Sequence, residues 1–391
     1  MSVNGYIKRV LKAPSKSFFL FGQRGSGKTS WIREECPDTL RIDLLDEAIY
    51  QRYLVDPGAF ARELLARCPV GRVAIDEIQR LPNLLNDVHR LIEEQNRVFI
   101  LSGSSSRKIK QKGVNLLAGR ALHRSMHPFL PEELGDQYSV DDVLRFGSLP
   151  IVFDAADDQE RRETLEAYVR MYLREEIQAE SVVRNLPAFA RFLPVAAVCH
   201  GQTINTASLA RDAGVARTTV AGYVDILEDT LMCFRVSGFE SKLRVKERKH
   251  PKLYWTDPGI VRAVRGNLYP PSNEERGALF EGLVAQTLRA YGDYRGLYDA
   301  MHYWALSGSA VEVDFLLEKA GTFVAIEVKN GRRFHERWCR GLRAVRELKG
   351  MTRRIIVCPV GEIMKTEDGI EVWPFLHFCM VLAENRLWGG M

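Results

Sequence analysis

Several features that would set this chain apart from ordinary globular proteins are missing from its sequence. Its 391 residues contain no apolar run near the roughly 18–20 residues that cross a bilayer. The basic N-terminal stretch has no apolar segment of the signal-peptide type. The seven cysteines are scattered and include no Cys-x-x-Cys pair, which disfavours a disulfide framework or a zinc site. We therefore expect a cytoplasmic protein with reduced thiols and no membrane partner.

The overall composition limits the class of protein but not its function. Apolar residues make up 46% of the chain, an ordinary fraction for a folded protein. The formal net charge of +5 permits nucleic-acid binding without requiring it. No internal repeat or low-complexity segment is present. A chain of this length is expected to form one to three domains.

The N-terminal part alternates apolar runs with helical patterns. Residues 17–22, 71–78 and 97–105 are apolar runs that end in glycine, acidic or small polar residues. The stretch "LPNLLNDVHRLIEEQ" after the second run has apolar residues at three-and-four spacing, as in an amphipathic helix. Strands that alternate with helices predict a parallel sheet covered by helices on both faces. We expect this α/β domain to span residues 1–125.

The first apolar run leads into a phosphate-binding loop. The stretch "GQRGSGKTS" matches G-x-x-x-x-G-K-[ST] between a strand and a helix. Its backbone amides and the helix N-terminus would bind the phosphates of ATP. Lys28 would reach the β- and γ-phosphates, and Thr29 would bind Mg²⁺. The predicted cofactor-binding residues are Gly22, Gln23, Arg24, Gly25, Ser26, Gly27, Lys28, Thr29 and Ser30.

Acidic and polar residues follow the next two strands. In "VAIDE", Asp76 at the strand end would take part in holding Mg²⁺, and Glu77 would activate the attacking water. A solvated acid pair in front of a helix is the alternative. In "SGSSS", Ser104 could polarise this water or sense the γ-phosphate. Ser102 and Ser105 are alternatives for that role.

The middle of the chain is predicted to be mainly helical. Residues 126–195 contain the long helical pattern "RRETLEAYVRMYLREEIQAE" and would form a lid or linker. Just before this region, "LLAGRAL" contains Arg120. This arginine is either a finger that reaches a neighbouring subunit's nucleotide or an ordinary surface residue.

Residues 196–252 have the order of elements expected of a winged helix-turn-helix. "TASLARDAG" predicts a helix closed by glycine, "ARTTVAGYVDILEDT" a second helix, and "LMCFRVSGFE" a strand. The second helix could enter a DNA major groove through Arg217 and Thr218. Winged helices also serve protein–protein contacts and nucleotide sensing. The basic run "KLRVKERKHPK" could follow the DNA backbone, with Lys242, Arg244 and Lys246 as contacts, next to Arg248 and Lys249.

A second α/β unit is expected over residues 253–391. "VEVDFLLEK" and "TFVAIEVKN" predict two successive strands, followed by a helix and another strand. Glu327 and Lys329 are two residues apart and so share one sheet face. Cross-strand pairing at a sheet edge would also explain these two charges. Glu281 interrupts the apolar helical stretch "GALFEGLVAQ", where a carboxylate is costly to bury without a partner.

The motifs, taken in order, resemble a prokaryotic family of predicted AAA+ ATPases with a winged helix and a C-terminal restriction-endonuclease-like domain. The resemblance spans nearly the whole chain. It implies a nucleotide-binding module, an oligomer such as a hexameric ring, and a PD-(D/E)xK nuclease domain. The stretches that carry it are "GQRGSGKTS", "VAIDEIQRLPNLL", "FILSGSSSRKI", "LLAGRAL", "FGSLP", "YLREEIQAE" and "YWTDPGIVRAV".

A PD-(D/E)xK site needs an aspartate at the end of one strand and an acid and a lysine on the next. Asp314, Glu327 and Lys329 supply this set, and Glu281 on a preceding helix would complete it. Asp314 and Glu327 would bind Mg²⁺, which lowers the pKa of bound water. Val313 stands where the family usually has proline. The arginines Arg332 and Arg333 follow this set and could bind phosphates.

We therefore expect an α/β multidomain protein that couples ATP hydrolysis to DNA processing, including cleavage of double-stranded or branched DNA. The choice of DNA rests on analogy with other proteins of the nuclease fold. The alternative is an ATP-controlled switch or a branch-migration motor in which the nuclease fold does not cut.

Overall fold

The computed structural model describes residues 5–67, 71–105, 117–172, 177, 183, 185–240, 250–306 and 308–389. It divides into two compact units. The first comprises residues 1–127 and 226–231, and the second comprises 128–225 and 232–391. The first unit covers the expected ATPase domain, whereas the boundaries expected at 195/196 and 252/253 both fall inside the second.

The described strands of the first unit form a five-stranded parallel sheet in the order β2-β3-β4-β1-β5. Strand β1 is buried along its whole length, as expected for a parallel strand covered on both faces. Because β1 and β3 are both interior strands, the loops that follow them meet at the carboxyl edge of the sheet. The strands are β1 Phe18–Gly22, β2 Thr39–Asp43, β3 Arg72–Asp76, β4 Val98–Gly103 and β5 Leu122–Met126.

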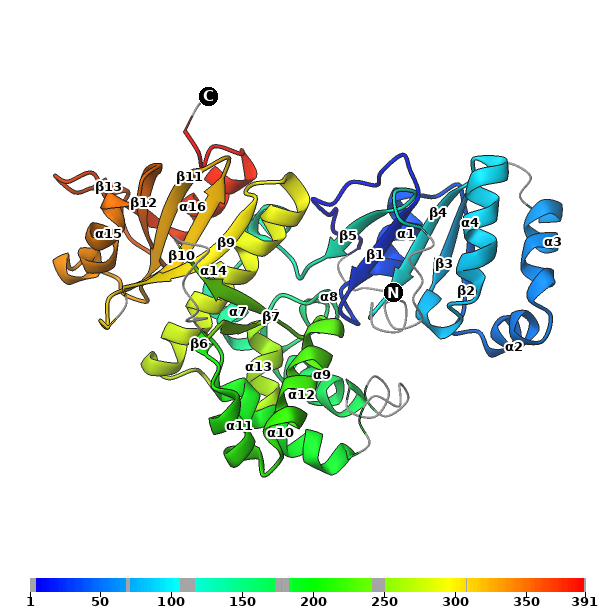
Figure 1. Ribbon diagram of the computed structural model, residues 1–391, viewed down its shortest axis with the longest axis horizontal. Coiled ribbons are helices and arrows are strands. Elements are labelled where there is room, and N and C mark those ends of the chain that lie inside the picture. The colour runs from blue at the N-terminus through cyan, green and yellow to red at the C-terminus, as the bar shows by residue number, and fades with distance from the viewer. Residues whose placement is uncertain are drawn as a thin grey trace. The chain divides into compact units, whose positions relative to one another are not determined.

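Helices pack against this sheet through apolar faces (Figure 1). The expected amphipathic helix is α4 Leu84–Gln95, and it buries Leu84, Leu85, Val88 and Leu91. This spacing of three and four residues places them on one face. The other helices of the unit are α1 Lys28–Glu35, α2 Glu47–Val55, α3 Pro57–Arg67 and the short 3₁₀ helix η1 Ile78–Arg80.

The second unit begins with helices, as expected for residues 126–195. Several begin at residues whose side chains accept backbone N–H groups, such as Asp157 at α9 and Asn205 at α11. Part of the expected segment "YLREEIQAE" lies outside the described residues. The helices are α6 Pro131–Leu134, α7 Val140–Phe146, α8 Pro150–Phe153, α9 Asp158–Met171, α10 Leu186–Val198, α11 Thr206–Ala213, α12 Arg217–Asp229 and α13 Pro258–Val264.

One continuous sheet runs through the rest of this unit, in the order β13-β14-β12-β11-β10-β9-β7-β8-β6. Strand β7 pairs with β8 antiparallel and with β9 in parallel, so these two strands, which were expected to belong to a separate winged helix, join the C-terminal sheet (Figure 1). The expected boundary at 252/253 therefore falls at the start of β8. The strands are β6 Gln202–Thr203, β7 Cys233–Gly238, β8 Lys252–Trp255, β9 Ala300–Ala305, β10 Glu312–Lys319, β11 Thr322–Val328, β12 Met351–Cys358, β13 Met364–Lys365 and β14 Glu371–Pro374.

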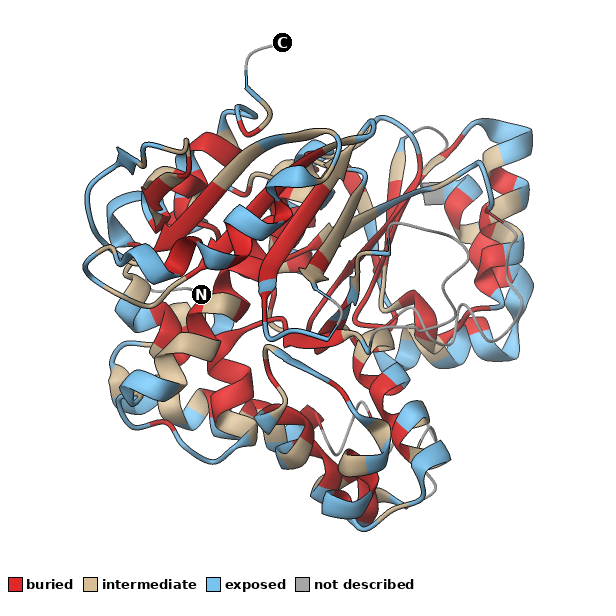
Figure 2. Ribbon diagram, turned by 60° about the vertical axis from the view of Figure 1, so that its left-hand side comes forward, coloured by how far each residue is buried: buried red, intermediate tan, exposed pale blue. Residues whose placement is uncertain are grey.

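The central strands of this sheet are buried beneath helix α14, Asn273–Arg295 (Figure 2). The helix contacts β8 and β11. A Cβ atom added at Gly282 would lie 2.0 Å from Nε2 of His200, so glycine permits this close approach. Helix α15 Arg340–Ala344 packs against β10 and β11. Helix α16 Phe375–Ala383 contacts α14 itself, where Phe375 lies against Phe280. Within the described residues, no helix combines the length and apolar character that a membrane span requires.

Candidate functional sites: a phosphate loop and a carboxylate–lysine cluster

The predicted phosphate loop connects β1 to α1 at the carboxyl edge of the parallel sheet. Gly27 precedes α1 with a φ of 87°, in the left-handed region that favours glycine. Gly22 has no room for a side chain, because a Cβ atom there would lie 2.8 Å from the carbonyl oxygen of Met126. The glycines are therefore required by the geometry of the loop.

Lys28 folds back over this loop. Its ammonium donates to the carbonyl oxygens of Gly22, at 2.7 Å, and Gln23, at 3.2 Å. The side chain is buried, and its charge lies against these loop carbonyls. The other loop residues differ in exposure: Gln23 and Ser26 are buried, Gly25, Gly27 and Ser30 are half-buried, and Arg24 and Thr29 are exposed.

The structure brings together the two residues expected to bind Mg²⁺ at this loop. The hydroxyl of Thr29 donates to Oδ2 of Asp76 at 2.6 Å. The second oxygen of Asp76 accepts a hydrogen bond from Ser102. A hydroxyl and a carboxylate are oxygen ligands of the kind that Mg²⁺ prefers, and the ion completes its shell with phosphate oxygens and water. Thr29 and Asp76 therefore fit a nucleotide-bound magnesium ion.

Glu77 and Ser104 lie in hydrogen-bond contact beside this pair. The hydroxyl of Ser104 donates to Oε2 of Glu77 at 3.3 Å. Gln79, which sequence analysis missed, donates its amide to the same Glu77 oxygen and to Ser104 Oγ. Glu77 has a φ of 56°, which is unusual for a residue with a side chain. Such backbone strain is frequent at functional sites. Gln79 stands three residues after Asp76, but no motif marked it.

Arg120 pairs within its own subunit. Its guanidinium donates to the carboxylate of Glu93 on α4 and to the carbonyl of Ala118 at 3.4 Å. The side chain is 39% exposed. A finger role toward a neighbouring nucleotide would require Arg120 to leave Glu93.

The expected DNA-reading residues lie at the start of α12. Arg217 and Thr218 are both exposed. The guanidinium Nε of Arg217 donates to Oγ1 of Thr206 at 3.1 Å, which ties the two helices α11 and α12 together. Of the expected basic contacts, Lys242, Arg244 and Lys246 lie outside the described residues. Arg332 and Arg333 are exposed just after β11.

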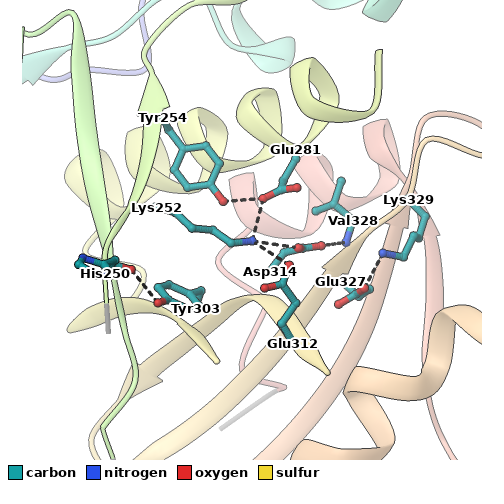
Figure 3. Close-up of polar contacts among 10 residues, drawn as sticks. All are labelled: His250, Lys252, Tyr254, Glu281, Tyr303, Glu312, Asp314, Glu327, Val328 and Lys329. Carbon is teal, nitrogen blue, oxygen red and sulfur yellow. Dashed lines mark hydrogen bonds and ion pairs between the residues drawn. The ribbon is translucent and has the colours of Figure 1, made fainter. Parts of the chain in front are cut away.

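The expected nuclease residues come from two antiparallel strands and one helix. Phe315 of β10 pairs with Ile326 of β11, which places Asp314 close to the end of β11. There the backbone N–H of Val328 donates to Oδ2 of Asp314 at 2.8 Å. Glu281 reaches the same region from α14 (Figure 3). Asp314 and Glu327 are almost fully buried.

A lysine that sequence analysis missed lies among these carboxylates. The ammonium of Lys252, on β8, is 3.2 Å from Glu281 Oε1, 3.4 Å from Glu312 Oε1 and 3.5 Å from Asp314 Oδ1. Figure 3 shows it between the helix residue and the two strand residues. The hydroxyl of Tyr254 donates to the same oxygen of Glu281 at 2.6 Å. Lys252 is the last residue of the basic run "KLRVKERKHPK", so its sequence context did not distinguish it from lysines expected to contact DNA.

Glu327 pairs with a different lysine. The ammonium of Lys329 is 2.5 Å from Glu327 Oε1, on the far side of Asp314 from Lys252 (Figure 3). Oε2 of Glu327 is buried and has no hydrogen-bond partner among the described residues. The four expected residues are thus near one another, but they form two lysine–carboxylate groups.

Burial and mutual repulsion shift the protonation of this cluster. Burial and then the charge of Asp314 raise the pKa of both Glu281 and Glu327. Burial alone would lower the pKa of Lys252, but the charges of Glu281, Asp314 and Glu312 outweigh it and raise that pKa. Lys252 is therefore charged at neutral pH, whereas the two glutamates retain protons to a higher pH than usual.

The arrangement differs from the metal site expected of a nuclease. Among the residues that the structure describes, no group of three or more His, Cys, Asp or Glu is placed to hold a metal ion. The expected ligands Asp314 and Glu327 each have an oxygen paired with an ammonium. As arranged, these carboxylates fit lysine partners rather than a divalent cation.

Comparison with known proteins divides the chain into three parts. Residues 14–135 match the model of a AAA domain family. Residues 137–269 and 276–378 match two different families, each described as a domain of unknown function, DUF8612 and DUF4143. The match of residues 14–135 to the AAA domain family agrees with the phosphate loop and the parallel sheet of the first unit. The expectation of an N-terminal AAA-type ATP-binding domain is therefore confirmed.

The chain is also similar to uncharacterized proteins of a bacterium and an archaeon, Mycobacterium tuberculosis and Methanocaldococcus jannaschii. One from Mycobacterium tuberculosis is 27% identical over 281 residues, 70% of this chain and 62% of that protein. One from Methanocaldococcus jannaschii is 24% identical over 357 residues, 79% of this chain and 70% of that protein. The chain thus spans less than two thirds of the mycobacterial relative.

Among solved structures, similarities include an Orc1 protein and a DnaA protein. The Orc1 protein of Aeropyrum pernix in complex with DNA is 15% identical, with a TM-score of 0.29 over 65% of this chain and 87% of that chain. AMPPCP-bound DnaA of Aquifex aeolicus is 15% identical, with a TM-score of 0.27 over 55% of this chain and 82% of that chain. TM-scores of this size do not indicate a shared arrangement of the whole chain.

Proposed function

We propose that this protein hydrolyses ATP and uses the nucleotide cycle to act on DNA. The observation that carries the proposal is the edge of the parallel sheet. There the hydroxyl of Thr29 lies 2.6 Å from Asp76, and Glu77 is hydrogen-bonded to Ser104 alongside. A phosphate loop, a magnesium pair and an acid with a polar partner are the parts that phosphoryl transfer to water requires.

Each residue has a separate task in this scheme. The loop amides and Lys28 bind the phosphates, and Thr29 and Asp76 hold Mg²⁺, which neutralises phosphate charge. Glu77 accepts the proton of the attacking water. Ser104 and Gln79 orient the Glu77 carboxylate, because both donate to its Oε2. On ATP binding, Lys28 exchanges its carbonyl partners in the loop for phosphate oxygens.

DNA is the proposed partner of the second unit. Arg217 and Thr218 are exposed at the N-terminal end of α12, where a recognition helix contacts bases or phosphates. Arg332 and Arg333 offer further exposed positive charge. Assembly into a hexameric ring, with Arg120 acting in a neighbouring subunit, extends this proposal by analogy with AAA+ proteins.

The C-terminal cluster supports two different functions. Cleavage of double-stranded or branched DNA would assign Glu281, Asp314, Glu327 and Lys329 to a magnesium-dependent nuclease. The second candidate is an ATP-controlled switch or branch-migration motor that does not cut DNA. The ion pairs of Lys252 and Lys329 with the expected metal ligands favour this second candidate.

One set of assays separates these functions. Wild type, Lys28→Ala, Lys329→Ala and the control Lys16→Ala, an exposed lysine, are incubated with supercoiled, linear and four-way-junction DNA. Each is tested with Mg²⁺ or Mn²⁺, with and without ATP. Lys28→Ala should lose ATP hydrolysis and Lys16→Ala should keep it. Hydrolysis that persists in Lys28→Ala would contradict the ATPase site.

The DNA products decide the role of the C-terminal cluster. Cleavage by wild type that is lost in Lys329→Ala would establish the nuclease. Cleavage that persists in Lys329→Ala would refute this site assignment. Strand movement or ATP-dependent DNA binding without cleavage would establish the second candidate.

A further inference from the structure

Lys252 is the most completely enclosed lysine partner in the carboxylate cluster. Its side chain is 4% exposed, whereas that of Lys329 is 33% exposed. A buried ammonium is stable only if charged or polar groups surround it. Lys252 has three carboxylate oxygens within 3.5 Å, one each from Glu281, Glu312 and Asp314.

The other side of the ammonium is also fixed. The ring centroid of Tyr303 lies 5.7 Å from Nζ of Lys252, within the range of a cation–π contact. The Tyr303 hydroxyl donates to the carbonyl of His250 at 2.7 Å, which holds the ring in place. Tyr254, two residues after Lys252 and so on the same strand face, donates to Glu281. The lysine is therefore seated among groups that are themselves held by hydrogen bonds.

This seat uses the same oxygens that a metal ion would need. Asp314 gives Oδ1 to Lys252 and Oδ2 to the backbone N–H of Val328. Glu281 Oε1 pairs with the ammonium of Lys252 and accepts a hydrogen bond from the hydroxyl of Tyr254. A divalent cation at these carboxylates would require oxygens at about 2.0–2.6 Å and would be repelled by an ammonium so close to them.

We propose that Lys252 is the cation of this cluster: its ammonium joins Glu281 to Asp314 in place of a divalent metal ion. Metal binding to Asp314 then requires removal of the lysine charge. Lys252 acts in this way whether or not the phosphate loop hydrolyses ATP. The cluster becomes a permanent bridge between β8, α14 and β10 rather than a site that is loaded and emptied.

Binding of Mn²⁺ to the full-length, nucleotide-free protein tests this role, with free Mn²⁺ measured by electron paramagnetic resonance. Wild type and Asp314→Asn should give the same binding isotherm. Lys252→Met should gain a site that binds Mn²⁺ at least tenfold more tightly than the wild-type protein does. The double variant Lys252→Met/Asp314→Asn should lose this site again. Lys252→Arg keeps the positive charge and should resemble wild type. The phosphate loop is common to all variants, so its own Mn²⁺ binding cancels.

Two results would overturn the proposal. One is a wild-type Mn²⁺ site that disappears in Asp314→Asn, because the metal would then bind while Lys252 is present. The other is a folded Lys252→Met protein that gains no site. If Lys252→Met does not fold, the wild-type and Asp314→Asn isotherms still decide the question.

Discussion

Lowering the pH from 7 to 5 should weaken the packing of α14 against β8 through His200. This side chain is buried, its Nδ1 accepts a hydrogen bond from the backbone N–H of Trp255 at 3.1 Å, and the close approach of Gly282 leaves no room around Nε2. Burial, with a smaller contribution from the charge of Arg265, lowers the pKa of His200 from 6.5 to about 4. The folded protein therefore keeps this imidazole neutral at pH values where the unfolded chain protonates it.

The sign and size of the effect follow from these two pKa values. Between pH 6.5 and 4 the unfolded chain binds a proton that the folded protein does not, so the free energy of unfolding falls as the pH falls. At pH 5 the two values correspond to a loss of about 2 kcal/mol relative to pH 7. Glu281 and Glu327 have the opposite effect on the free energy of unfolding as the pH falls. Their raised pKa values make the folded protein bind protons more readily than the unfolded chain.

A variant separates His200 from these glutamates. His200→Gln removes the titrating group and keeps an acceptor for the Trp255 N–H. Urea unfolding of both proteins, followed by circular dichroism at pH 7 and pH 5, gives the two changes in unfolding free energy. The wild-type value should fall by about 2 kcal/mol more than that of His200→Gln. Equal pH dependence in the two proteins, at unchanged denaturant slopes, would refute the low pKa of His200.

Three further predictions concern packing, capping and catalysis. Gly282→Ala should lower the free energy of unfolding by about 1–3 kcal/mol, and Gly282→Ala/His200→Ala should lose less than the sum of its two single variants; additive losses in urea unfolding would contradict the contact. Asp257→Ala should lower the free energy of unfolding by about 2 kcal/mol, because Asp257 accepts hydrogen bonds from the N–H groups of Ser148 at 2.8 Å and Ile260 at 3.1 Å. An unchanged midpoint of urea unfolding would contradict this prediction. Ser104→Ala should lower kcat for ATP about tenfold with little change in ATP affinity, and a loss of ATP binding in a titration with a fluorescent ATP analogue would argue against its placement beside Glu77.

The phosphate loop of the proposed nucleotide site could be located from sequence because its residues are consecutive. Residues 22–30 specify the loop by their order, and Asp76 is marked by its place at the end of a buried strand. The sequence could not decide among the three serines of "SGSSS". The structure places Ser102 against Asp76 and Ser104 against Glu77, a distinction that depends on how β4 lies beside β3.

The C-terminal cluster was predictable only in part because it depends on pairing between distant strands. Alternation along "AIEVKN" places Glu327 and Lys329 on one face, and the structure shows them paired. Lys252 comes from β8, which joins the C-terminal sheet through the β7–β9 pairing. Nothing local in a basic run reveals that one of its lysines is buried among carboxylates more than twenty residues away in sequence.

Strand pairing also determines which face of β8 carries Lys252, because β8 lies between β7 and β6 in the continuous sheet. Lys252 and Tyr254 face the carboxylates, so Leu253 and Trp255, both buried, face the opposite side of β8. A slip of β8 by one residue would reverse every side chain, exposing the carboxylates to an apolar residue and driving an ammonium into an apolar layer. Intermediate positions have no hydrogen-bonded register. The register of β8 in the sheet therefore keeps Lys252 on the face of the strand that carries the carboxylates.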